Sequence, residues 1–167
     1  MQVKISIDPG IWGFGAAVWL RRYWKLKVSI PIETYCIDVK PKNRTRVVSK
    51  TDVLAKVQQI LLLWFDKYDV EDMFVEKPLK RQVAIKESLD IEVMRGVIRG
   101  VTLPCQCNWH DVEVAHWKGQ LPKDLVAERI ATLYGLHDLD ICKYLTRNYL
   151  HDWDAVGIGL YEQGFFK

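Results

Sequence analysis

Alternation of apolar and polar residues dominates the first part of the chain. Residues 3–8 alternate one by one, a pattern that predicts a strand with one buried face. Asp8-Pro9-Gly10 is a turn signal that ends this strand, and an apolar run over residues 16–20 predicts a second strand. A third alternating run lies within residues 24–36. We therefore predict three consecutive strands over residues 2–38, each antiparallel to its neighbour.

Helical spacing replaces alternation in the middle of the chain. Residues 49–52 read Ser-Lys-Thr-Asp, the Ser-x-x-acid form of a helix start. Apolar residues then recur at helical spacing as far as Tyr68. Residues 72–76 predict a short buried strand, and Ser88 is expected to cap a second amphipathic helix that closes near Gly100.

The last third of the chain predicts one more strand and two helices. The strand is expected within residues 105–114, one helix from Leu121-Pro122 to Tyr134, and a last helix over residues 149–161. Three leading strands followed by alternating helices and strands are typical of an α/β sandwich with a mixed sheet. No repeat or linker interrupts the pattern, so we predict a single domain over residues 1–167.

Composition narrows the class of protein. The 167-residue chain is 49% hydrophobic and 27% charged, which excludes disorder and allows a sizeable core. No apolar run approaches the ~20 residues that a membrane helix needs, and the first residues lack the layout of a signal peptide. Four cysteines do not make a disulfide scaffold in a chain of this length. We therefore expect a cytoplasmic protein with no membrane partner. Its net charge of +3 excludes a histone-like polycation and is compatible with a nucleic-acid partner.

Three acidic residues lie where predicted elements begin or end. Asp8 ends the first strand and Glu76 ends the buried strand. Asp154 lies near the start of the last helix, three residues after His151, so the two side chains share a helix face while Asp152 points elsewhere. A buried acid is costly unless it is paired or binds a cation, although each acid alone fits a residue that makes turn hydrogen bonds. As a set, they predict a site for Mg²⁺ or Mn²⁺.

This set suits the hydrolysis of a phosphodiester. Two-metal hydrolysis needs several oxygen ligands that hold ions ~3.5–4 Å apart, one ion activating the attacking water and the other stabilising the leaving 3′ oxygen. A neutral imidazole such as that of His151 takes one ligand position or positions the water. The alternative role of His151 is to cap or pack the helix, and that of Asp152 is to supply favourable charge in the first turn.

Five segments, in order along nearly all of the chain, resemble the motifs of one family. They are Ile5-Ser6-Ile7-Asp8-Pro9-Gly10 with Gly13-Phe14-Gly15, Phe74-Val75-Glu76, Met94-Arg95-Gly96-Val97-Ile98, Trp117-Lys118-Gly119 with Lys123, and His151-x-x-Asp154-Ala155-Val156-Gly157. Together they resemble the RuvC family of Holliday-junction resolvases, which have an RNase H-like fold. The small size of the chain resembles phage or other viral members.

The resemblance implies a fold, a reaction and a set of site residues. The implied fold is an RNase H-like three-layer sandwich, with helices flanking a mixed five-stranded sheet. The implied reaction is a Mg²⁺-dependent paired nicking of a four-way DNA junction by a homodimer, with two ions in each active site and Mn²⁺ as a substitute. The implied catalytic and metal-binding residues are Asp8, Glu76, His151 and Asp154. His151 stands where the usual set has a third acid, and Leu79 stands where many members carry an aromatic residue beside the junction centre.

Basic residues are concentrated in two stretches. Residues 18–50 hold nine basic side chains against two acidic ones, and residues 77–86 hold four without an acid. The second stretch follows directly on Glu76, where a scissile phosphate would lie, and phosphate contacts of this kind weaken as salt rises. With two lysines from the resemblance, the predicted DNA-binding residues are Lys77, Lys80, Arg81, Lys86, Lys118 and Lys123. The strand-borne lysines of the first stretch fit a solvated face better.

Other patterns support other functions less well. Cys105-x-Cys107 with His110 invites a zinc site, but the spacing differs from that of ordinary zinc clips. The glycine-rich turn over residues 10–15 suggests nucleotide binding. The nucleotide-binding enzymes that share such a turn need two paired domains, and this chain is too short for them. Trp12 and Trp117 are candidates for stacking on DNA bases. Two alternative functions stay open: another nuclease of the same fold acting on forks, flaps or RNA, and a junction-binding protein without catalysis.

Overall fold

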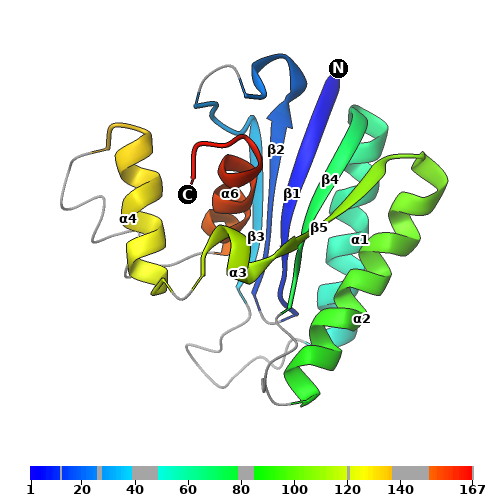
Figure 1. Ribbon diagram of the computed structural model, residues 1–167. Coiled ribbons are helices and arrows are strands. Elements are labelled where there is room, and N and C mark those ends of the chain that lie inside the picture. Colours follow the sequence, from blue (N-terminus) through cyan, green and yellow to red (C-terminus); the bar gives the residue numbers. More distant parts are fainter. Residues whose placement is uncertain are drawn as a thin grey trace.

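A five-stranded mixed sheet with helices on both faces forms the centre of the computed structural model (Figure 1). The structure describes residues 1–11, 13–25, 28–38, 49–78, 85–119, 121–136 and 151–166, without the side chains of residues 85–87, 123, 124 and 152. The elements, in chain order, are β1 (Gln2–Pro9), β2 (Gly13–Leu20), the 3₁₀ helix η1 (Arg21–Tyr23), β3 (Glu33–Asp38), α1 (Lys50–Lys67), β4 (Asp69–Lys77), α2 (Ile85–Thr102), the 3₁₀ helix η2 (Leu103–Cys105), β5 (Asn108–Glu113), α3 (Val114–Trp117), α4 (Lys123–Leu133) and α6 (His151–Glu162).

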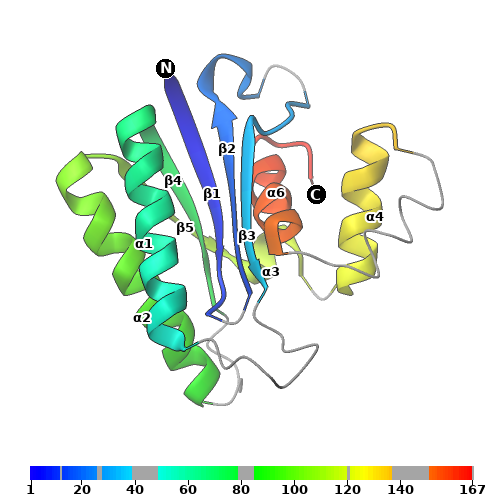
Figure 2. The ribbon, with the colours of Figure 1, turned by 180° about the vertical axis from the view of Figure 1, so that it is seen from behind.

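The strands lie in the order β3-β2-β1-β4-β5. β2 is antiparallel to both β1 and β3, whereas β4 is parallel to both β1 and β5. Helices α1 and α2 cover one face of this sheet, and α3, α4 and α6 lie on the other (Figures 1 and 2). The predicted three-layer sandwich with three leading antiparallel strands is confirmed.

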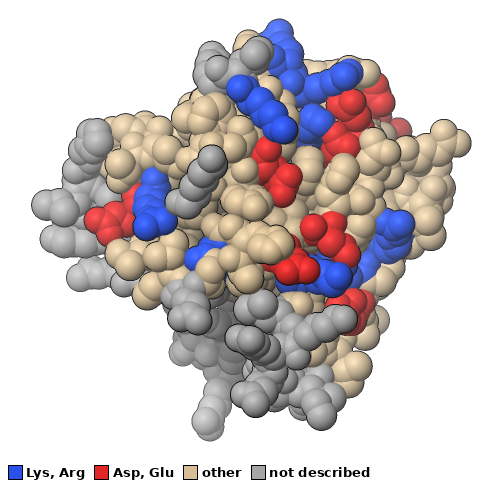
Figure 3. Space-filling view, viewed as in Figure 1, with Lys and Arg blue, Asp and Glu red and all other residues tan. Residues whose placement is uncertain are grey.

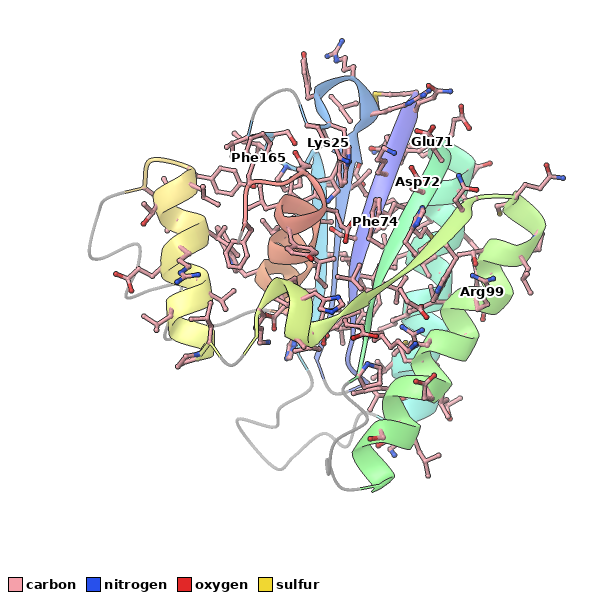
Figure 4. All side chains as sticks on the ribbon, viewed as in Figure 1. Lys25, Glu71, Asp72, Phe74, Arg99 and Phe165 are labelled. Carbon is pink, nitrogen blue, oxygen red and sulfur yellow. The ribbon has the colours of Figure 1, made fainter. Side chains whose placement is uncertain are left out.

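Strict alternation along β1 sends its side chains to the two faces of the sheet, and each face is covered by a separate core. Val3, Ile5 and Ile7 are fully buried against α1 and α2. On the other face, the second core contains Trp19 from β2 and Phe74 from β4, together with α3, α4 and α6. Asp72 and Phe74 of β4 lie on this second face (Figure 4). Each face of the sheet is therefore buried by a different set of helices.

Local signals place most of the helices where the sequence predicts them. The Ser49 hydroxyl accepts from the Asp52 backbone N–H, and the Asp52 carboxylate accepts from the Ser49 N–H, so the predicted capping box starts α1. Pro122 immediately precedes α4. Gly135 follows this helix with φ +69°, a conformation that glycine adopts without strain. No helix among the described residues is both long and apolar enough to cross a membrane.

Several predicted boundaries are wrong. The third strand begins at Glu33 rather than near residue 24, because Pro31 has no N–H to donate to a ladder and the buried Ser29 hydroxyl bonds to Gln163 instead. α2 begins at Ile85, so Ser88 lies inside that helix and does not cap it.

Two further strands also differ in their bounds from the prediction. β4 starts three residues earlier than predicted, at Asp69. The segment over residues 103–105 is a 3₁₀ turn that starts at a proline-containing step, so β5 begins only at Asn108 and is shorter than expected.

Two glycines let α6 pack closely against its neighbours, Gly159 against β2 of the sheet and Gly157 against α3. A Cβ atom on Gly159 would come within 2.4 Å of the Trp19 ring, and one on Gly157 would come within 2.6 Å of the Trp117 ring. The close contact fixes the axis of α6 across β1 and β2. It therefore fixes where the first residues of α6 lie relative to the carboxyl end of β1.

Candidate active site

Three of the predicted site residues converge at the carboxyl end of β1. Asp8 comes from β1, and His151 and Asp154 from the first turn of α6. One possible ligand atom from each residue lies within 4.8 Å of the others, a spacing that fits a shared metal ion. His151 Nδ1 is 2.8 Å from Asp8 Oδ2. Asp8 is 8% exposed and Asp154 only 2%, so this group is held inside the protein.

A glycine makes room for the imidazole. A Cβ atom at Gly13 would lie only 1.7 Å from His151 Nε2. Gly13 is the first residue of β2, and β2 returns antiparallel beside β1. The absence of a side chain there therefore allows the His151 ring to occupy the space next to Asp8. The sequence shows this glycine, but its role depends on a contact between residues 138 positions apart.

Glu76 lies beside Asp8 on the neighbouring parallel strand. The β1–β4 register ends with Ile7 opposite Val75, so the next residues, Asp8 and Glu76, follow on adjacent strands ~4.8 Å apart. The Trp117 indole N–H donates to Glu76 Oε2 at 3.0 Å. Glu76 is not one of the three residues that share the 4.8 Å cluster. It approaches that cluster from the β4 side.

The surroundings of Glu76 disfavour its negative charge. Desolvation is the largest cause, followed by the nearby charge of Asp8, and the pKa of Glu76 rises to about 8. Asp154 acts in the same direction, whereas Lys118 and the Trp117 N–H act against it. Three carboxyl groups are thus gathered here, and Lys118 offsets only part of the negative charge that acts on Glu76. A divalent cation is the group that such a donor set fits.

Lys118 is the one predicted DNA-binding residue that the described structure brings to this cluster. Its Nζ atom is 3.3 Å from Asp154 Oδ1, and its side chain is 16% exposed. Lys77 lies at the end of β4, where its Nζ is 3.6 Å from Asp111 Oδ2. Lys77 therefore faces a carboxylate of β5. The structure does not bring it to the acidic cluster.

Several predicted residues lie outside what the structure describes. They are Lys80, Arg81, Leu79 and Trp12, together with the side chains of Lys86, Lys123 and Asp152. The described part of the last predicted helix begins at His151 and includes Asp154.

Two contacts at Glu76 were not predicted from the sequence. The first is the Trp117 hydrogen bond, and the second is a bond from Arg95 Nη1 to the Glu76 carbonyl at 2.7 Å. Arg95 and Trp117 both lie in segments that carry the family resemblance, so that resemblance was the available signal. Trp117 is 2% exposed and packs against Phe166, so base stacking by its ring is not open to it in this conformation.

The zinc hypothesis finds no support among the described residues. Cys105 lies in η2, and His110 Nε2 is 2.8 Å from Asp72 Oδ1. Within the part of the chain that the structure describes, the group able to hold a metal is Asp8, His151 and Asp154.

Basic and acidic side chains are mixed on the face that carries α6. Figure 3 shows acidic groups next to basic ones over this face, with no single large patch of either sign among the described residues. This agrees with the small net charge of +3.

Comparison with solved structures identifies the fold. Protein-family models and curated proteins give no match to the sequence. A structure of Thermus thermophilus RuvC in complex with a Holliday junction substrate matches with a TM-score of 0.68 and 16% identity, over 100% of this chain and 99% of that chain. A second T. thermophilus RuvC structure matches with a TM-score of 0.64 and 15% identity, over 99% and 98% of the two chains. The chain has the RuvC fold. The RuvC likeness covers the whole sheet and its flanking helices, and it confirms the RNase H-like architecture predicted above.

Proposed function

We propose that this protein is a structure-selective endodeoxyribonuclease that resolves four-way DNA junctions with divalent cations. The observation that carries the proposal is the convergence of Asp8, His151 and Asp154, with Glu76 beside them, at the carboxyl end of β1. The RuvC fold supports the choice of substrate, because one matched structure holds a Holliday junction substrate. No other described cluster offers a comparable donor set.

The residues present fit Mg²⁺ or Mn²⁺. Carboxylate oxygens are the ligands that Mg²⁺ prefers, and an imidazole nitrogen suits Mn²⁺ as well. Asp8, Glu76 and Asp154 would hold two ions, with His151 as a further ligand. The chemistry that two such ions supply when bound is activation of the attacking water and stabilisation of the leaving 3′ oxygen.

The protein side chains at this site have defined tasks. An ionised Asp8 only accepts hydrogen bonds, so a neutral His151 that donates to it through Nδ1–H has a lone pair on Nε2. That lone pair either binds a cation or accepts a proton from a water. Lys118 lies 3.3 Å from Asp154 and offsets its charge, and its proposed task is to contact a phosphate oxygen of the scissile group. Lys80, Arg81, Lys86 and Lys123 remain predicted phosphate contacts.

A homodimer is part of the proposal, since a two-fold junction cut on opposed strands requires two active sites. α2 offers a surface for the second copy. Leu89 and Val93 are 59% and 51% exposed on this helix, and a Cβ atom on Gly96 or Gly100 would meet nothing within 4 Å. These residues recur at helical spacing along one face of α2. Small and apolar residues on one stripe allow a second helix to pack closely.

The dimer is tested by charge on that stripe. We expect L89E/V93E to sediment as a monomer of 19.5 kDa where the wild-type protein sediments at about twice that mass. Leu62 on α1 is similarly exposed, at 51%, so L62E is the matched control and should leave the dimer intact. A wild-type protein that sediments as a monomer in the presence of junction DNA would rule out the dimer.

The proposed activity is tested on a supercoiled plasmid that carries an extruded cruciform. Paired nicks within one binding event convert this plasmid to the linear form, whereas isolated nicks leave a nicked circle. We expect linear product in Mg²⁺ and none in EDTA. A panel of synthetic forks, flaps and RNA/DNA hybrids tests the other nuclease functions. Tight junction binding without cleavage in Mg²⁺ or Mn²⁺ would instead indicate a junction-binding protein.

A further inference from the structure

Arg95 connects α2 to the end of β4, next to the candidate active site. Its side chain is 10% exposed although it carries a permanent charge. Nη1 donates to the Glu76 carbonyl at 2.7 Å, and Nη2 donates to Asp111 Oδ1 at 2.6 Å. The guanidinium also lies 5.6 Å from the centre of the Trp109 ring. One side chain thus joins a helix to two neighbouring strands.

The bond to Glu76 falls where the sheet itself gives less support. The β1–β4 register ends at Ile7 and Val75, one residue before Glu76. On the other side of β4, Glu76 is still paired with Val112 of β5. Arg95 therefore holds the β4 main chain at the residue just beyond the β1 ladder, and Asp111 anchors Arg95 to the adjacent strand.

A role in packing alone does not account for a buried arginine. An apolar side chain would fill the same space without the cost of desolvating a charge. The guanidinium, by contrast, is a rigid planar fork that reaches two acceptors at once, which lysine does not do. The charges that act most strongly on the Glu76 carboxylate come from Asp8, Lys118 and Asp154. What Arg95 supplies is therefore the position of the Glu76 main chain.

We propose that Arg95 is a positioning residue for Glu76. By holding the Glu76 main chain, Arg95 sets the distance between the Glu76 carboxylate and Asp8, and thereby the affinity of the site for divalent cations. This inference rests on the proposed function, in which Glu76 is a metal ligand. It predicts that loss of the Arg95 fork weakens cation binding through Glu76 and through no other route.

A double-mutant cycle on Mn²⁺ affinity tests the inference without DNA. Mn²⁺ binding is measured by electron paramagnetic resonance on the wild-type protein, R95K, E76Q and R95K/E76Q. Residues that orient a metal ligand typically contribute 10- to 100-fold to affinity, so we expect R95K to bind Mn²⁺ about tenfold more weakly. In the E76Q background the same substitution should cause no further loss.

Control variants separate positioning from loss of stability. Ile98 is fully buried on the same helix and does not contact Glu76 in any described bond, so I98V should lower the melting temperature and leave Mn²⁺ affinity unchanged. Glu92 lies 3.4 Å from Arg95 Nε and is 56% exposed. E92Q should therefore also leave Mn²⁺ affinity unchanged. If R95K does not fold, D111A removes the anchor of the fork and should weaken binding by a smaller factor.

The outcomes distinguish the inference from the proposed function. A folded R95K with wild-type Mn²⁺ affinity would overturn the inference, as would an R95K effect of equal size in the E76Q background. Where R95K does not fold, unchanged affinity in D111A would overturn it. An E76Q protein that binds Mn²⁺ as tightly as wild type would instead contradict Glu76 as a ligand, and with it the proposed metal site.

Discussion

The two ends of the β1–β4 strand pair differ in how the protein balances the charge of an acidic side chain. On one face of the sheet, β1 carries Lys4 near its amino end and Asp8 at its carboxyl end, while β4 carries Asp72 and Glu76. Each pair is four residues apart, or ~13 Å along a strand. At the amino end, Asp72 of β4 therefore lies beside a lysine of β1, Lys4. At the carboxyl end, Glu76 lies beside a second acid, Asp8.

The carboxylate at the amino end is fully partnered by the protein. Asp72 accepts hydrogen bonds from Lys4, from His110 at 2.8 Å and from Asn108 at 3.1 Å. Burial raises the pKa of Asp72, but these hydrogen bonds lower it further than burial raises it. The ring of Phe74 stacks between those of Trp24 and His110, with its centre 5.3 Å from the Trp24 ring centre and 4.8 Å from the His110 ring centre. These three side chains cover this end of the face.

The carboxyl end lacks this balance. Desolvation and the charge of Asp8 raise the pKa of Glu76, and Lys118 only partly opposes them. The comparison shows that burial alone does not define a functional site, since Asp72 is buried and Glu76 is partly buried. What differs is how far the described residues supply the opposing charge. The end where they offset the charge acting on the acid only in part is the one suited to divalent cations.

The largest expected effect comes from Gly13→Ala. The added Cβ atom would lie 1.7 Å from His151 Nε2, so the ring must move away from Asp8. We expect junction cleavage to fall by about 100-fold, the size typical of losing a general acid–base or equivalent group. In the H151A background, G13A should cause no further loss. An additional loss there would show that Gly13 acts on something other than His151.

The amino end should behave as a structural cluster. Asp72→Asn weakens the hydrogen bonds of Lys4 and His110, and we expect it to reduce the free energy of unfolding by about 2 kcal/mol at pH 7. Because the pKa of Asp72 is lowered by folding, its contribution is present above the unfolded pKa and is lost as pH falls through the folded value. Urea denaturation at pH 7 and pH 3 measures both effects.

Mn²⁺ affinity of D72N should equal that of the wild-type protein. The exposed Asp66 provides a control with the same change of charge, and D66N should leave the free energy of unfolding unchanged. A large drop in Mn²⁺ affinity of D72N would mean that the two ends of the face are not independent.

At the carboxyl end, removing the acid should change the free energy of unfolding in the opposite direction. Because folding raises the pKa of Glu76, its protonation stabilises the folded protein, and this contribution is lost as pH rises from about 4.5 to about 8. In EDTA, Glu76→Gln is therefore expected to increase the free energy of unfolding by about 1 kcal/mol or more at pH 8, while showing little difference at pH 4. An E76Q protein that is less stable than wild type at pH 8 in EDTA would contradict the account of Glu76.

The smallest expected effect is that of Trp117→Phe. Phenylalanine keeps most of the buried ring but loses the N–H that donates to Glu76 Oε2. We expect cation affinity to fall about threefold, in line with ~0.7 kcal/mol for one hydrogen bond. Isothermal titration with Mn²⁺ measures the change, and an affinity above that of wild type would show that the N–H opposes cation binding.

The contrast between the two ends also marks what the sequence could predict. Alternation placed Asp8 at a strand end, and a short buried strand placed Glu76 at another. Helical spacing placed His151 and Asp154 on one face, as the structure has them. Asp72 and Glu76 nevertheless look alike in sequence, since each is an acid beside apolar residues of one strand. Whether each acid is balanced by a protein cation depends on the residue opposite it on β1. That partner is set by register, including a shift between Val3 and Lys4 that no local pattern reveals.

Contacts between residues far apart in the sequence could not be predicted from local patterns either. Trp117 and Glu76 are 41 residues apart, and their hydrogen bond depends on how α3 turns back over the sheet after β5. The bond from Arg95 to the Glu76 carbonyl requires the position of α2 on the opposite face. The start of α2 itself was misplaced, because Ser88 resembles a cap but lies within a continuing helix. Local patterns predicted the elements, and packing decided which side chains meet.

Junction cleavage by the wild-type protein and by Asp8→Asn tests the central claim most directly. Asparagine keeps the shape of the side chain and removes the charge next to His151 and Glu76. On a synthetic four-way junction in Mg²⁺, we predict cuts on opposed strands by the wild-type protein. D8N should bind the same junction with unchanged affinity and leave it uncut. Undiminished cleavage by D8N would contradict the assignment of this site.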